Sequence, residues 1–235
     1  MYSEICENLP VDYTVGLVTT CNMCCEMCFR RWDPNKYSKD FIDDDVFQKL
    51  VNAMRTQKPE IIRWHCDGEL LNEPAASKFL NTVVEMSADE NCFSTNGQNI
   101  DHYIEKLVGT KLTLLIISVD AATEETYKKI RHANFSKLLN NIRKLNTYKE
   151  ENNLSTPRLK FMFVLMEENK HELGLFVEIA KFLNVSEIEV MPLNTAVCSS
   201  SKLREVQLEE AKRVCKFAKA NANESGIIFN FGYDA

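Results

Sequence analysis

Short apolar runs alternate along this chain with longer stretches in which apolar residues recur at helical spacing. The runs predict strands, because near-continuous apolar segments of this length fit a sheet that is covered on both faces. They lie at residues 13–19, 61–64, 92–94, 112–119, 159–166 and 188–191, and residues 227–229 begin one further strand.

The stretches between these runs predict helices. The first helix begins at the acidic residues 43–45, which suit the positive end of a helix dipole. Its apolar residues Val46, Phe47, Leu50, Val51 and Met54 share one face, and Phe79, Leu80, Val83, Val84 and Met86 form the buried stripe of the second helix. Further helices are predicted near residues 103–107, 135–148, 173–183 and 205–222.

Six strand–helix units in succession, without hairpin signals, predict a parallel sheet with right-handed crossovers. The units are too few for a closed eight-stranded barrel, so we expect an α/β fold, an open (β/α)6 partial TIM barrel. Residues 13–225 form this core domain. Residues 1–12 are an N-terminal leader, and residues 226–235 are either the chain end or the start of a C-terminal extension.

Length, net charge and apolar content argue against some classes of function. The 235 residues suit one domain, and 28 Lys and Arg against 34 Asp and Glu give a net charge of −6, which argues against nucleic-acid partners. The sequence has neither a membrane-spanning apolar run nor a basic-then-apolar start, so we expect a cytoplasmic protein with no membrane partner.

Four of the nine cysteines lie between residues 21 and 28, after the first predicted strand. The spacing Cys21-x-x-x-Cys25-x-x-Cys28 offers three thiolates from one loop, a set that can hold an iron–sulfur cluster with one iron left open. Alternatives are buried structural cysteines, or half of a zinc site completed by Cys66, Cys92 or a histidine. Cys24 is expected to be a bystander, although it could replace Cys25 as a ligand.

Further segments follow the predicted strands in order. They are Cys66-Asp67-Gly68-Glu69 through Pro74, Ser94-Thr95-Asn96-Gly97, Ser118-Val119-Asp120 with Tyr127 and Arg131, Asn169 with Glu172-Leu173, and Val190-Met191-Pro192-Leu193. Taken alone, an Asp-Gly-Glu or an Asn-Gly is usually just a turn, and Arg131 could be a solvated helix residue. Together with the cysteine loop, the series resembles the radical S-adenosylmethionine (radical SAM) superfamily, most closely its SPASM/twitch-containing branch.

The resemblance implies the cofactors and their ligands. Cys21, Cys25 and Cys28 would bind a [4Fe–4S] cluster whose open iron chelates S-adenosylmethionine. Gly68 would let the backbone approach, Glu69 would accept from the methionine ammonium, and Ser118 and Arg131 would bind its carboxylate. The remaining implied cofactor contacts are Ser94, Asn96 and Asp120 near the ribose or sulfonium, and Met27, Leu165 and Leu193 near the adenine.

The family pattern is not matched at every position. Asp67 stands where the Gly-Gly-Glu motif has its first glycine, and Met27 stands where the residue before the third cysteine is commonly aromatic. Asp67 adds a carboxylate beside an anionic cluster. A backbone contact from Met27 to adenine survives the exchange.

The resemblance also implies a reaction. The cofactor would be cleaved reductively to a 5′-deoxyadenosyl radical that abstracts hydrogen from a peptide, protein or small metabolite. An electron donor such as flavodoxin or ferredoxin would supply the electron, and the subclass (oxidoreductase, transferase or lyase) stays open. Alternatives are a glycyl-radical-type activating enzyme and a non-catalytic cluster- or zinc-binding barrel. Cys198 and Cys215 alone cannot hold an auxiliary cluster.

Overall fold

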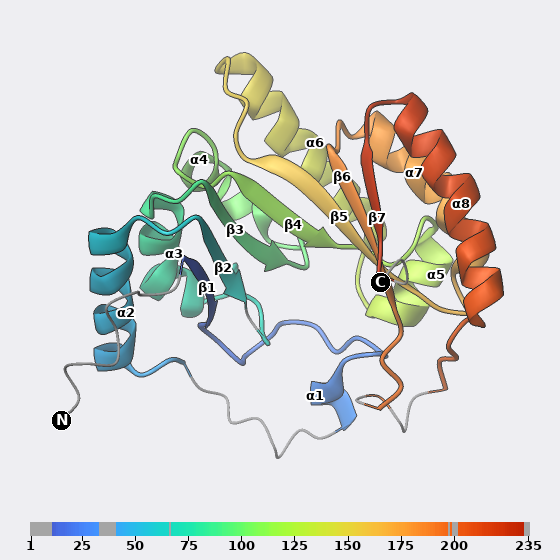
Figure 1. The fold of residues 1–235 in the computed structure, drawn as a ribbon, viewed down its shortest axis with the longest axis horizontal. Helices are drawn as coiled ribbons and strands as arrows, with labels where there is room; N and C mark the ends of the chain where they lie inside the picture. Colours follow the sequence, from blue (N-terminus) through green and yellow to red (C-terminus); the bar gives the residue numbers. More distant parts are fainter. Residues whose placement is uncertain (1–10, 33–40, 66, 197, 199–201, 233–235) are drawn as a thin grey trace.

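The fold is built on one curved sheet of seven parallel strands, arranged in the order β1-β2-β3-β4-β5-β6-β7 (Figure 1). The computed structural model describes residues 11–32, 41–65, 67–196, 198 and 202–232. The expected leader therefore lies almost wholly outside the described residues, as does Cys66. Every strand pairs with its neighbour in sequence, so all strands point the same way and their C-terminal ends meet at one edge.

The strands are β1 (Asp12–Gly16), β2 (Ile61–His65), β3 (Glu90–Thr95), β4 (Leu114–Ser118), β5 (Arg158–Leu165), β6 (Glu187–Pro192) and β7 (Ile228–Phe231). The helices are α1 (Phe29–Trp32), α2 (Asp44–Gln57), α3 (Ala75–Glu85), η1 (Ile100–His102), α4 (Ile104–Leu107), α5 (Glu124–Arg131), α6 (Phe135–Glu151), η2 (Lys170–Glu172), α7 (Leu173–Phe182) and α8 (Leu208–Glu224). The parallel α/β architecture expected from the sequence is confirmed.

A seventh strand, β7, follows the six units, as the run at residues 227–229 predicts. The helix predicted near residues 103–107 is present as α4, is preceded by η1, and ends before Gly109, which has a positive φ of 73°. One detail differs from the expectation: Val46, expected on the buried face of α2, lies in the first turn of the helix and is 46% exposed.

Capping side chains explain where several helices begin. Asp43 accepts from the backbone N–H groups of Asp45 and Val46 at the start of α2. Thr123 accepts from Thr126 at α5, and Asn134 accepts from Lys137 at α6. Each side chain satisfies a donor that the first helical turn leaves unpaired.

The two faces of the sheet have different chemistry. Side chains such as Trp64, Phe93 and Phe161 point to the helices and form the main core, where they are at most 1% exposed. Phe176 of α7 packs against Phe163, with ring centroids 4.8 Å apart. The alternate positions face the hollow of the curved sheet and include polar and charged residues. The helix-facing residues therefore stabilise the fold and leave the concave face free to carry a site.

We find no helix in the described part of the chain with the length and apolar character needed to cross a bilayer.

Candidate functional site

The cysteine loop follows β1 and is fastened to the protein at both ends. At its start, the N–H groups of Gly68 and Glu69 donate to the carbonyls of Val18 (2.9 Å) and Thr20 (2.8 Å). Toward its end, the Glu26 N–H donates to the Ile130 carbonyl at 2.8 Å. The loop is thus held between the segment after β2 and the last turn of α5.

The close approach of the cysteine loop to the segment after β2 requires glycine at position 68. A Cβ atom built there would lie 2.0 Å from the Thr20 carbonyl oxygen and 2.7 Å from the carbonyl carbon of Thr19. The backbone that comes close to Gly68 is therefore the protein's own cysteine loop. The sequence-based reason, room for a ligand, was incomplete.

A chamber of about 560 Å³ opens at the concave face of the sheet, and we call it the central chamber. Of the expected site residues, it brings together nine, which line it: Cys21, Cys25, Cys28, Gly68, Glu69, Ser94, Asn96, Ser118 and Arg131. These residues come from the cysteine loop after β1, from the segment after β2, and from β3, β4 and α5. Residues far apart in sequence therefore meet in one cavity.

Glu69 is buried in the chamber wall at 2% exposure. Its carboxylate accepts from the Leu71 N–H (3.0 Å), the Thr95 hydroxyl (2.7 Å) and the Asn96 N–H (2.7 Å). Burial raises the pKa of Glu69, and these hydrogen bonds oppose the increase. The bonds fix the carboxylate in position, and its oxygens retain capacity to accept from a cationic ligand.

Arg131 reaches the chamber from the end of α5 and is 8% exposed. Its Nε lies 2.8 Å from Asp120 Oδ2, and its Nη1 donates to Cys25 Sγ at 3.3 Å. Its buried Nη2 has no hydrogen-bond partner among the described residues. An unpaired buried guanidinium nitrogen is costly, so this donor is well suited to receive an anionic ligand group.

Asp120 is placed differently from the expectation. It is 2% exposed, and its Oδ1 accepts from the Val164 N–H at 2.7 Å while Oδ2 faces Arg131. It is absent from the chamber lining. The structure thus places Asp120 where it holds Arg131, and the ribose or sulfonium contact expected of Asp120 stays a prediction.

Asn96 connects the third strand to the cysteine loop. Its Nδ2 donates to Asn22 Oδ1 at 2.8 Å and lies 4.0 Å from Cys21 Sγ. The Met23 N–H also approaches Cys21 Sγ, at 3.4 Å. Burial raises the pKa of the Cys21 thiol to about 11. Sequence reasoning missed Asn22 and Thr95, which are immediate neighbours of expected residues, and also the charged lining residues Arg63, Glu90, Lys160 and Glu189, which no motif marks.

The three expected adenine contacts separate into two groups. Leu193 belongs to a small apolar cluster with Ile130 and Met166, against which Met27 packs. Leu165 is instead fully buried in the main helix-facing core. Its position at the end of β5 points it away from the chamber, so the expectation for Leu165 is not supported, whereas Met27 and Leu193 lie together.

The remaining cysteines bear on the alternatives. Cys24 is exposed and lies outside the chamber lining, whereas Cys25 is buried within it. Cys92 lines the chamber, and Cys215 lies in the main core. In the ranges that the structure describes, no three His, Cys, Asp or Glu side chains converge on a point where one metal ion could bind. Cys66, which the zinc alternative also named, lies outside the described residues.

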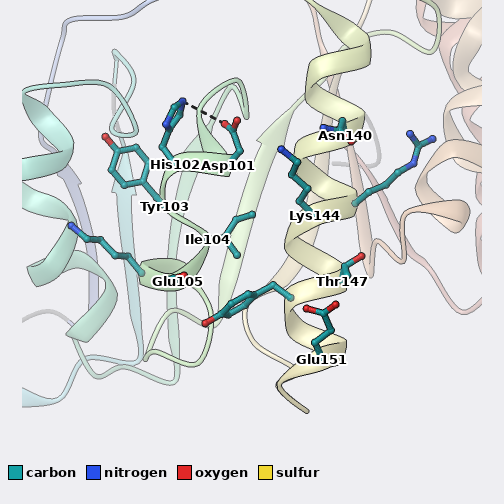
Figure 2. A pocket seen from close by; sticks show the side chains of 12 residues that line it. Asp101, His102, Tyr103, Ile104, Glu105, Asn140, Lys144, Thr147 and Glu151 are labelled. Atoms are coloured by element: carbon teal, nitrogen blue, oxygen red, sulfur yellow. Dashed lines mark ion pairs between the residues drawn. The ribbon is translucent and has the colours of Figure 1, made fainter.

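A second hollow, of about 700 Å³, lies on the outer side of the protein between α4 and α6. Figure 2 shows that α6 contributes Asn140, Lys144, Thr147 and Glu151, which face the segment Asp101–Glu105. Acidic and basic side chains are mixed in its lining, and none of the expected site residues is among them. The central chamber is thus the stronger candidate.

Comparisons with known proteins show the family and the fold of the chain. A family model described as the Radical SAM superfamily matches residues 15–180. The chain is 27% identical over 139 residues to the FeMo cofactor biosynthesis protein NifB of Bradyrhizobium diazoefficiens, a match that covers 55% of this chain and 28% of NifB.

Solved structures share the fold. SuiB of Streptococcus suis bound to its precursor peptide SuiA superposes with a TM-score of 0.77 at 11% identity, covering 95% of this chain and 49% of SuiB. SuiB bound to S-adenosylmethionine gives 0.77 at 12% identity, over 95% of this chain and 50% of SuiB. A radical SAM methyltransferase from Sphaerobacter thermophilus gives 0.66 at 16% identity, over 95% and 67%. The chain thus spans half or less of the length of NifB and SuiB.

Proposed function

Because the chain belongs to the radical S-adenosylmethionine superfamily, we propose that it cleaves S-adenosylmethionine reductively and uses the product to abstract hydrogen from a substrate. The cofactors of this class are a [4Fe–4S] cluster and S-adenosylmethionine. When bound, the reduced cluster supplies one electron that splits the cofactor into methionine and a 5′-deoxyadenosyl radical. The observation that carries the proposal is the central chamber, where three loop thiols meet a fixed carboxylate and an unpaired guanidinium nitrogen.

The residues present fit these groups. Cys21, Cys25 and Cys28 come from one loop and face one chamber. Thiolates are the usual ligands of iron–sulfur clusters, so three of them on one loop suit such a cluster. Three thiolates leave one iron open for a ligand.

Side chains around the chamber supply the contacts that S-adenosylmethionine needs. Glu69 accepts from a cationic ammonium, and Nη2 of Arg131 donates to a carboxylate. Ser94 and Ser118 offer hydroxyl groups nearby, and Asn96 orients the start of the cysteine loop through Asn22. Met27 packs against the apolar cluster that contains Leu193, a surface outside the chamber lining that suits an adenine ring.

The chamber continues below these residues along the concave face of the sheet. Arg63, Glu90, Lys160 and Glu189 line this deeper part, together with Ile116. Lys160 is held by Glu189 (3.2 Å) and Glu187 (3.3 Å), so it is fixed in place. A polar, charged floor favours a peptide or a small polar metabolite as substrate. The precursor peptide bound by SuiB supports the peptide option, and an electron donor such as flavodoxin or ferredoxin completes the system.

The test is release of 5′-deoxyadenosine. Protein reconstituted anaerobically with iron and sulfide is mixed with dithionite and S-adenosylmethionine, and the products are separated by chromatography. We expect 5′-deoxyadenosine from the native chain, and none from a variant in which Cys21, Cys25 and Cys28 are all Ala. A reconstituted, iron-loaded protein that releases none would refute the proposal and favour a non-catalytic cluster protein.

A further inference from the structure

We propose that Arg131 is a positioning residue that raises the reduction potential of the cluster through its hydrogen bond to Cys25. This inference rests on the proposed ligand set, because it requires Cys25 to bind iron. It concerns the cluster itself and is separate from the contact of Arg131 with S-adenosylmethionine. The observation behind it is the 3.3 Å approach of Arg131 Nη1 to Cys25 Sγ.

The charges around this contact are buried. Cys25 is 7% exposed, Arg131 is 8% exposed and Asp120 is 2% exposed. Water therefore screens the guanidinium charge less than it would at the protein surface, so the charge acts more strongly on the sulfur. Asp120 compensates that charge at 2.8 Å from Nε, so the local field at Cys25 depends on both side chains.

The backbone fixes the geometry. Arg131 is the last residue of α5, and the carbonyl of its neighbour Ile130 accepts from the N–H of Glu26, the residue that follows Cys25. The two partners thus sit on backbone segments joined by a 2.8 Å hydrogen bond. Asp120 is held through its bond from the Val164 N–H. The N–H···S contact is therefore preorganised before any cofactor binds.

The direction of the effect follows from electrostatics. A donor N–H and a positive charge beside a thiolate ligand stabilise negative charge on it. Reduction adds one electron to the cluster and takes up no proton in this step, with dithionite or a reduced flavoprotein as the donor. The more negative, reduced state gains more from Arg131 than the oxidised state does, so the potential rises.

The experiment is a potentiometric titration of the reconstituted protein without S-adenosylmethionine, followed by the EPR signal of the reduced cluster. Arg131→Met combined with Asp120→Asn removes both charges and leaves the buried site neutral. We expect its midpoint potential to be more negative than that of the native protein. Asp120→Asn alone keeps the acceptor for Val164 and suits the positive φ of 64° at this position. It leaves the guanidinium uncompensated, so we expect a shift in the opposite direction.

The chain offers a matched control in Arg31, whose Nη1 lies 3.6 Å from Sγ of Cys24. Because Cys24 is not a proposed ligand, Arg31→Met should leave the midpoint unchanged. Arg131→Lys serves if the double variant does not fold: it removes the planar guanidinium that reaches Cys25 and Asp120 together, so its midpoint should lie below the native value, and an unchanged midpoint counts against the inference.

The possible results separate the two proposals. Shifts of opposite sign in Asp120→Asn and in the double variant, with none in Arg31→Met, support the inference. Equal midpoints in all variants, or a shift in Arg31→Met of the same size as in the double variant, overturn it. Native protein that binds no iron would instead contradict the proposed function.

Discussion

Replacing Gly68 by Ala tests the close packing of the cysteine loop against the segment after β2. The added Cβ would lie 2.0 Å from the Thr20 carbonyl oxygen, whereas Cβ contacts under 3.0 Å are essentially never found in proteins. The other atom involved belongs to the backbone, so no side chain can rotate away. The two segments must separate by about 1 Å or more at this point, the difference between these two distances.

The cost follows from what the separation breaks. Two hydrogen bonds join the segments, from Gly68 N–H to Val18 and from Glu69 N–H to Thr20. Losing both costs about 1–3 kcal/mol, and the residual overpacking adds about 1–3 kcal/mol, so we expect the free energy of unfolding to fall by about 2–6 kcal/mol. The cysteines move with the loop, so bound iron should also decrease.

The assay is urea unfolding followed by tryptophan fluorescence, since Trp64 of β2 is fully buried. The matched control is Gly174→Ala in α7, where an added Cβ meets nothing within 4 Å. That change should stabilise the protein by about 0.5–1 kcal/mol, because Ala is the better helix former. If Gly68→Ala unfolds at the native urea midpoint and binds the native amount of iron, the close approach described here is wrong.

Three further changes test other parts of the structure. Glu69→Gln keeps the size of the side chain but removes its charge, and should weaken S-adenosylmethionine binding by about ten- to a hundred-fold in an EPR titration while the cluster remains; undiminished affinity would exclude Glu69 as the ammonium acceptor. Asn91→Ala removes the acceptor of the Trp64 Nε1–H group and the donor to the carbonyls of Val83 and Met86. We expect the free energy of unfolding in urea to fall by about 3 kcal/mol, against less than about 0.5 kcal/mol for the control Asn223→Ala at an exposed position. Lys160→Met should destabilise the protein at about pH 8 and less at about pH 11. Burial opposes the charge of Lys160, but Glu189 and Glu187 outweigh it and raise the pKa, so the stabilising contribution of Lys160 is lost as pH rises through that pKa. An equal cost at both pH values would refute the pairing.

The sequence predicts the sheet well for a physical reason. Parallel strands are covered by helices, so runs such as the one at β4 stand out from their polar surroundings. The pattern is less informative for the inner face. In β5, Lys160 and Met162 alternate with Phe161 and Phe163, and only the curvature of the sheet shows that they line a chamber. Local pattern therefore predicts the elements but not the chemistry of the hollow between them.

Site contacts between distant segments could not be predicted at all. Arg131 and Cys25 are 106 positions apart, and no periodicity connects them. The resemblance implies a cofactor contact for Asp120, but nothing in the sequence indicates its bond from the Val164 N–H or its ion pair with Arg131. The cysteine spacing was informative because one loop carries it, so the ligands needed no tertiary contact to be recognised.

The most direct test of the account is the iron content of two single variants, Cys25→Ala and Cys24→Ala, after anaerobic reconstitution. Cys25 is buried in the central chamber beside Arg131, whereas Cys24 is exposed outside its lining. We predict that Cys24→Ala retains about four iron atoms per chain with the native EPR signal, and that Cys25→Ala loses most of both. Loss of the cluster in Cys24→Ala together with retention in Cys25→Ala would contradict the ligand set, and with it the proposed roles of the chamber residues.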